Sequence, residues 1–180
     1  MLQTRRLLLR PWQESDREPF QRLDADPTVM EFFAAPLSPV ESDGMIDRIQ
    51  AHIARHRFGF FAAELRATGE FIGFVGMSHV PFEAHFTPCV EIGWRLAAAH
   101  WNRGLATEGA RRCLRYAFQE LALPEVVAFT VPANLRSRRV MEKLGMSYSL
   151  ADDFQHPRLP EGHLLRPHVL YRVRLLQSQP

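Results

Sequence analysis

The sequence predicts one α/β domain over residues 1–180, and three observations support this prediction. Two β-rich segments, 59–65 and 70–80, flank a short turn that contains Gly69, which predicts an antiparallel hairpin. After Val90 the chain is expected to alternate strand, helix, strand, helix, an order typical of an α/β layer. A chain of 180 residues can bury roughly 70% of its unfolded surface, which is enough for one core.

The composition indicates a globular domain that binds neither nucleic acid nor membranes. The residues are 46% hydrophobic and 23% charged, which is too apolar for a disordered chain. The net charge is +2 and both signs are interspersed, so no nucleic-acid partner is expected. No segment approaches the ~20 consecutive apolar residues that span a bilayer.

Cysteine usage indicates a reducing compartment. Cys89 and Cys113 are the only cysteines and form no CxxC motif, which excludes a disulfide framework and a zinc knuckle. We therefore expect a cytoplasmic protein.

The first half of the chain predicts a strand and two helices before the hairpin. The apolar run 7–12 predicts the strand, and Ser15 with Asp16 gives an N-cap signal for a short helix. A second helix is expected from about Pro39, with acidic residues early and arginines late, as the helix dipole favours. The apolar faces of these two helices carry Phe20, Leu23, Met45, Ile46, Ile49 and Ile53.

The second half predicts the alternating unit and two closing strands. Segment 90–96 predicts a strand, and the amphipathic segment from about Gly104 to Leu121 predicts a long helix. The β-branched run 125–131 predicts the next strand, and Asn134 opens a further helix. The closing strands are expected at residues 146–150 and 168–175.

The turn that opens the long helix is a candidate anion site. It runs from Asn102 and Arg103 through Gly104 to Ala106 and Thr107, after a strand. Several backbone N–H groups without helical partners converge there at the positive end of the helix, where a diphosphate would bind. The small residues at positions 104 and 106 would let the anion approach closely. An ordinary strand-to-helix turn is the alternative interpretation.

The second helix opening adds polar side chains on one face. Asn134, Ser137 and Met141 are spaced by three and four residues, and Arg138 and Arg139 extend toward an adjacent edge. Taken singly, Asn134 is explained as an N-cap and Ser137 as a solvated helix serine. Two such openings in succession favour a ligand that carries both phosphates and amides.

Together these segments resemble the GNAT superfamily of acetyl-CoA-dependent N-acetyltransferases, and the resemblance covers most of the chain. Gly104 and Ala106 are similar to the small residues of its acetyl-CoA loop, Q/R-x-x-G-x-G/A. The later N-x-x-S/A helix that ends in K-x-G-F is matched by Asn134, Ser137, Lys143, Gly145 and Met146. Segments 91–94, 106–108 and 140–145 resemble the Rim-type branch, which includes ribosomal-protein N-terminal acetyltransferases.

The resemblance implies a mixed, largely antiparallel twisted sheet with helices on both faces. It also implies acetyl-CoA as cosubstrate and direct attack of a primary amine in a ternary complex, so neither cysteine is required. The pantetheine amides are expected to pair with the strand backbone at Trp94, Arg95 and Leu96. The other cofactor contacts are expected from Asn102, Arg103, Gly104, Ala106, Thr107, Asn134, Ser137 and Lys143.

The resemblance leaves the catalytic groups less defined. Glu91 is the candidate base, acting directly or through water, and a structural glutamate paired with an arginine is the alternative. Asp152, Asp153 and His156 are further candidates. Met141 stands where many relatives carry a proton-donating tyrosine, which methionine cannot replace. Either Ser137 supplies that proton, or the thiolate leaves unaided because a thiol pKa near ~8.5 makes it a tolerable leaving group.

The resemblance indicates the class of acceptor and partner but not their identity. A protein N-terminal α-amine is the favoured acceptor; a small amine (polyamine, amino acid or aminoglycoside) and a non-catalytic coenzyme A sensor are alternatives. The apolar segment 78–88 could form an acceptor-side wall or the contact of a homodimer.

His52 and His56 have the spacing of a helical metal pair, but no HExxH frame or downstream carboxylate completes it, so no metal is expected.

Overall fold

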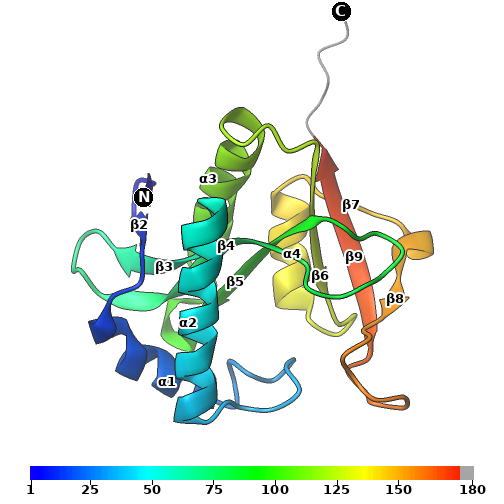
Figure 1. Cartoon of the computed structure of the whole chain (residues 1–180), viewed down its shortest axis with the longest axis horizontal. Coiled ribbons are helices and arrows are strands. Elements are labelled where there is room, and N and C mark those ends of the chain that lie inside the picture. The colour runs from blue at the N-terminus through cyan, green and yellow to red at the C-terminus, as the bar shows by residue number, and fades with distance from the viewer. Residues whose placement is uncertain (175–180) are drawn as a thin grey trace, which may run out of the picture.

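The computed structural model describes residues 1–174, and its core element is one twisted sheet (Figure 1). The strand order is β1-β2-β3-β4-β5-β6-β9-β7, with β8 paired to β9. Neighbouring strands are antiparallel except β5 and β6, which are parallel. The strands are β1 (Leu2–Gln3), β2 (Leu7–Arg10), β3 (Phe60–Leu65), β4 (Phe71–His79), β5 (Val90–Leu96), β6 (Glu125–Thr130), β7 (Ser147–Tyr148), β8 (Phe154–Gln155) and β9 (Pro167–Arg174).

Helices cover both faces of this sheet, as predicted. The helices are α1 (Arg17–Ala25), α2 (Pro39–His56), α3 (Leu105–Gln119) and α4 (Leu135–Lys143). Residues of α1 and α2 share one core cluster with Ala62, and residues of α3 and α4 share another with Ala63. Because neighbouring residues of a strand point to opposite faces, the two clusters lie on opposite sides of the sheet. None of the helices within residues 1–174 is long and apolar enough to cross a membrane.

The second helix starts at Pro39 as expected, and the β3–β4 turn contains Gly69 with a positive φ of 71°. The structure adds a capping box of Ser38 and Glu41 at the start of α2. Asp16 behaves differently: its side chain does not cap α1 but is buried in an ion pair with Arg10, at 2.7 Å. The closing strand expected at residues 146–150 is found only over the two residues of β7, and the strands β1 and β8 were not predicted because two residues show no alternation. The predicted strand end at Leu175 lies outside the described residues.

The sheet opens between β5 and β6. Strand β5 pairs with β4 at every residue from Val90 to Leu96, but β6 pairs with it only at Glu91 and Val127. Beyond Glu91, therefore, the second edge of β5 has no strand partner within residues 1–174. This opening positions the candidate site.

Candidate active site

The open edge of β5 presents backbone groups at Trp94. The N–H of Ala97 donates to the Ile72 carbonyl of β4, at 2.9 Å. Because successive residues of a strand direct their N–H and C=O groups to alternate sides, those of Leu96 and Trp94 face away from β4. The Leu96 carbonyl accepts a hydrogen bond from the indole of Trp101, at 2.7 Å. The backbone of Trp94 is thus left on the open side, where an extended ligand can pair with it.

Arg95, which was predicted to contact the cofactor, lies between Trp94 and Leu96 and points away from the open edge. Its backbone points toward β4, and its buried guanidinium donates to Asp24 of α1, at 2.6 Å. The guanidinium carbon also lies 4.1 Å from the ring centre of Phe33. Neither the backbone nor the side chain of Arg95 is directed to the open edge.

The start of α3 has the geometry expected of an anion site. Gly104 adopts a positive φ of 75° immediately before the helix, and Asn102 a φ of 57°. The first intrahelical bond of the turn runs from the Glu108 N–H to the Gly104 carbonyl, at 3.0 Å. The N–H groups of the preceding helical residues, which include Ala106 and Thr107, have no carbonyl four residues back within the helix.

A basic groove adjoins this helix start. It has a volume of about 660 Å³ and includes Gly104, Thr107 and Lys143 among the predicted residues. Its other lining residues are Thr4, Arg5, Arg6, Glu108, Arg111, Arg112 and Arg115. Glu108 is already bound by Thr4 and Arg6, which help hold the pKa of its carboxyl below its usual range. The remaining cations give the groove a net positive charge, which suits phosphate groups.

The sequence did not identify these arginines as site residues. Arg5 and Arg6 reach the groove from the connection between β1 and β2, far from α3 in the chain. A signal did exist for Arg111 and Arg115, whose i, i+4 spacing places them on one face of the helix. Asn102 and Arg103 are exposed in the turn, outside the lining of the groove.

At the second helix opening, Asn134 has the structural role that its N-cap position predicts. Its Oδ1 accepts from the Ser137 N–H and its Nδ2 donates to the Thr130 hydroxyl, both at 3.1 Å. The Ser137 side chain is partly exposed, and its hydroxyl makes no hydrogen bond within residues 1–174. Met141 is 1% exposed and packs in the core, so it does not line the opening.

Glu91 lies where β5 and β6 separate. Burial raises the pKa of its carboxyl to about 7, and the positive charge of Arg158 opposes this shift. No side chain of residues 1–174 forms a hydrogen bond or ion pair with the carboxylate, so the alternative of a structural arginine pair finds no partner there. A carboxyl with this pKa is a competent base near neutral pH.

The other titratable candidates either form hydrogen bonds within the protein or have a pKa far from neutral pH. Asp152 accepts two hydrogen bonds from Arg172, at 2.9 and 3.0 Å, and Asp153 accepts one from Tyr148 at 3.2 Å. Burial together with the charges of His168 and Arg158 lowers the pKa of His156 to about 4. Burial raises the pKa of the two thiols, to about 11 for Cys89 and about 12 for Cys113. Neither thiol therefore ionises appreciably at neutral pH.

Comparison with known proteins identifies the family. The model of the acetyltransferase (GNAT) domain matches residues 6–147. The chain belongs to the GNAT acetyltransferase family. The protein is therefore an N-acetyltransferase of the acetyl-CoA-dependent class, and the predicted fold and enzyme class are confirmed.

Individual relatives and a solved structure are similar to most of the chain. The chain is 34% identical over 149 residues to the uncharacterized protein YkkB of Bacillus subtilis, covering 82% of this chain and 86% of that protein. It is 36% identical over 158 residues to the FsC-acetyl coenzyme A-N(2)-transacetylase of Aspergillus fumigatus, covering 82% of this chain and 65% of that longer protein. The crystal structure of an acetyltransferase from Agrobacterium tumefaciens superposes with a TM-score of 0.79 at 29% identity, covering 97% and 94% of the two chains.

Proposed function

We propose that this GNAT enzyme belongs to the Rim-type branch and acetylates the α-amine of a protein N-terminus. The observation that carries the proposal is Glu91, a base with a pKa of about 7 at the point where the sheet opens. An α-amine has a pKa near ~8, so a weak base suffices to remove its proton, whereas a lysine side chain near ~10.4 demands more. This difference favours an α-amine over an alkylamine.

The residues around the opening fit acetyl-CoA, which supplies the acetyl group as an activated thioester. The open edge of β5 at Trp94 would hold the pantetheine amides as an added strand. The N-terminus of α3 and the cations of the adjoining groove, Lys143 among them, would hold the phosphates. Backbone N–H groups at the strand edge could also stabilise the developing oxyanion.

Two side chains would then accept and donate the protons of the reaction. Glu91 accepts the proton of the attacking amine, directly or through water. The Ser137 hydroxyl donates a proton to the departing thiolate, because it is accessible at the start of α4 and Met141 is buried in the core. The high pKa values of the Cys89 and Cys113 thiols support direct transfer without an acyl-enzyme.

The carboxylates near the opening argue against a polyamine acceptor. Asp24 is paired with Arg95, and Asp152 with Arg172. Glu91 is thus left as the carboxylate without an ion-pair partner among these three, within residues 1–174. A ligand with one amine at the reacting centre matches this arrangement better than one with several positive charges.

A small-molecule acceptor is the second candidate. It is favoured by the 36% identity to the FsC-acetyl coenzyme A-N(2)-transacetylase, whose name gives FsC as the compound acted on. A small acceptor would need the same base and the same donor site, so the two candidates differ only on the acceptor side.

Thiol-release kinetics with acetyl-CoA would separate these functions. We expect turnover on peptides with a free α-amine and none on the same peptides with the α-amine blocked. Turnover on small amines alone would support the second candidate. Stabilisation by coenzyme A in a thermal-shift titration, with no turnover on any amine, would instead support a non-catalytic sensor and refute the proposed reaction.

A further inference from the structure

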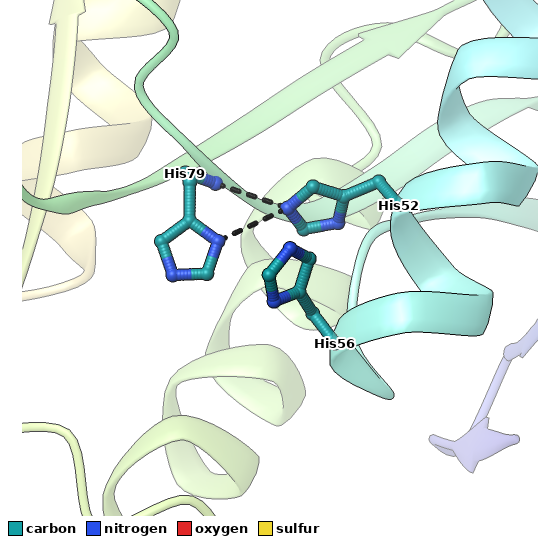
Figure 2. A group of neighbouring side chains, drawn as sticks. All are labelled: His52, His56 and His79. Carbon is teal, nitrogen blue, oxygen red and sulfur yellow. Dashed lines mark hydrogen bonds between the residues drawn. The ribbon is translucent and has the colours of Figure 1, made fainter.

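Three histidine side chains converge at the C-terminal end of α2 (Figure 2). His52 and His56 come from the last turns of α2, and His79 is the last residue of β4. One ring nitrogen of each lies within 4.8 Å of the others. The sequence offered only the helical pair, because the third histidine is brought to it by the β3–β4 hairpin.

Helix geometry and the end of α2 account for this convergence. The i, i+4 spacing brings the rings of His52 and His56 to a centroid distance of 4.6 Å. The helix ends at Arg57 with a positive φ of 65°, which turns the chain so that Phe58 is buried beside all three imidazoles. The Phe58 ring therefore forms an apolar side of the cluster that excludes water.

The orientation of His52 resembles that of a metal ligand. Its Nδ1 lies 2.9 Å from the Phe58 carbonyl oxygen, so Nδ1 carries the proton and Nε2 is an acceptor. That Nε2 lies 3.2 Å from Nδ1 of His79 and accepts from the His79 backbone N–H at 3.3 Å (Figure 2). A hydrogen bond from the outer ring nitrogen to a carbonyl is the usual support of a metal-bound histidine.

The donor set selects the class of ion. The cluster contains three imidazoles and no carboxylate, which disfavours the oxygen-seeking ions Mg²⁺ and Ca²⁺. Imidazole nitrogens suit Zn²⁺ and its first-row neighbours, and His79 is exposed, so water can occupy a fourth position. We propose that His52, His56 and His79 bind one divalent transition-metal ion of the zinc class and thereby tie α2 to the end of β4.

Binding requires a proton shift on His79 and the release of the His79 backbone N–H from Nε2 of His52, whose single lone pair then binds the ion. In the free protein the Nδ1–H of His79 is the donor to Nε2 of His52, since His52 carries its own proton on Nδ1. For metal binding the His79 proton moves from Nδ1 to Nε2, which leaves Nδ1 as a ligand atom. The three imidazoles stay neutral, and the ion carries the charge.

Metal titration of the full chain, with every affinity-tag histidine removed, tests this site. Isothermal titration with Zn²⁺ should give one ion per chain. Co²⁺ should show the intense visible absorption of a tetrahedral complex. Zn²⁺ at about 100 times its dissociation constant should also raise the melting temperature by about 5 °C or more.

Matched variants make the result specific. His56→Ala and His79→Ala should each weaken Zn²⁺ binding by about 100-fold or more. His85→Ala removes an exposed histidine outside the cluster and should bind as the wild type does. Coenzyme A stabilisation, retained in all variants, would show that each is folded. The proposal is overturned if the wild type binds no ion, or if His56→Ala and His79→Ala bind as tightly as His85→Ala.

Discussion

The indole Nε1 of Trp101 donates a 2.7 Å hydrogen bond to the carbonyl oxygen of Leu96, at the last residue of β5. Arg136 of α4 lies over the same indole, 4.6 Å from the ring centre, and pairs with Glu31 at 2.6 Å. Trp101 stands where the family's acetyl-CoA loop usually carries Gln or Arg. It closes the far end of the open strand edge and connects it to α4.

Replacing Trp101 should therefore destabilise the protein. Trp101→Phe keeps an aromatic ring under Arg136 but removes the donor to Leu96. We expect the free energy of unfolding to fall by about 1–2 kcal/mol, because the carbonyl loses its partner. Urea denaturation measures this change. Trp101→Phe with wild-type stability would mean that this hydrogen bond contributes nothing to folding.

Glu91→Gln should abolish general base catalysis. We expect kcat/KM to fall by about 100-fold or more, with coenzyme A stabilisation unchanged. The base acts in its ionised form, and its pKa is raised to about 7, so the wild-type rate should rise with pH through about 7. The ionisation of the acceptor is common to both proteins and cancels in their ratio. A ratio independent of pH would exclude Glu91 as the base.

Ser137→Ala tests the proton donor. The Asn134 cap accepts from the backbone N–H of residue 137, so it survives the substitution and the fold should be unaffected. We expect kcat to fall by about tenfold or more while coenzyme A binding changes little. Ser15→Ala, at an exposed serine before α1, is the matched control. An unchanged kcat would mean that the thiolate leaves without help from the enzyme.

Lys143→Ala tests the basic groove. Lys143 is the only lysine of the chain; it is exposed and lines the groove beside Arg111. Loss of one charge-assisted phosphate contact should raise the dissociation constant of coenzyme A by about tenfold at low salt, and by less at high salt. Arg22→Ala removes an exposed cation of α1 and should have no effect. Equal affinities of the two variants would place the phosphates elsewhere.

Local periodicity predicted the order of the main elements, because α2, α3 and the β3–β4 hairpin each carry strong signals within one short window. The helix starts at Gly104 and Asn134 were visible for the same reason. The strand expected at residues 146–150 is present but shorter, as β7, whereas β1 and β8 were not predicted, since two residues cannot show a period.

Features that depend on contacts between distant parts of the chain could not be predicted from the sequence. Asp16 could be read as a cap, but its burial depends on the ion pair that it forms with Arg10 of β2 in the folded chain. Arg5 and Arg6 meet α3 only in the folded chain. The pKa of Glu91 likewise depends on burial, which the strand pattern alone did not give.

The position of acetylation on a single peptide tests the proposed acceptor and base most directly. A peptide with a free α-amine and one internal lysine would be incubated with acetyl-CoA and the enzyme, and the product sequenced by tandem mass spectrometry. We expect acetyl on the α-amine, with the rate reduced about 100-fold or more in Glu91→Gln. Acetylation of the lysine side chain would contradict the proposed α-amine acceptor, and equal rates for the wild type and Glu91→Gln would contradict Glu91 as the base.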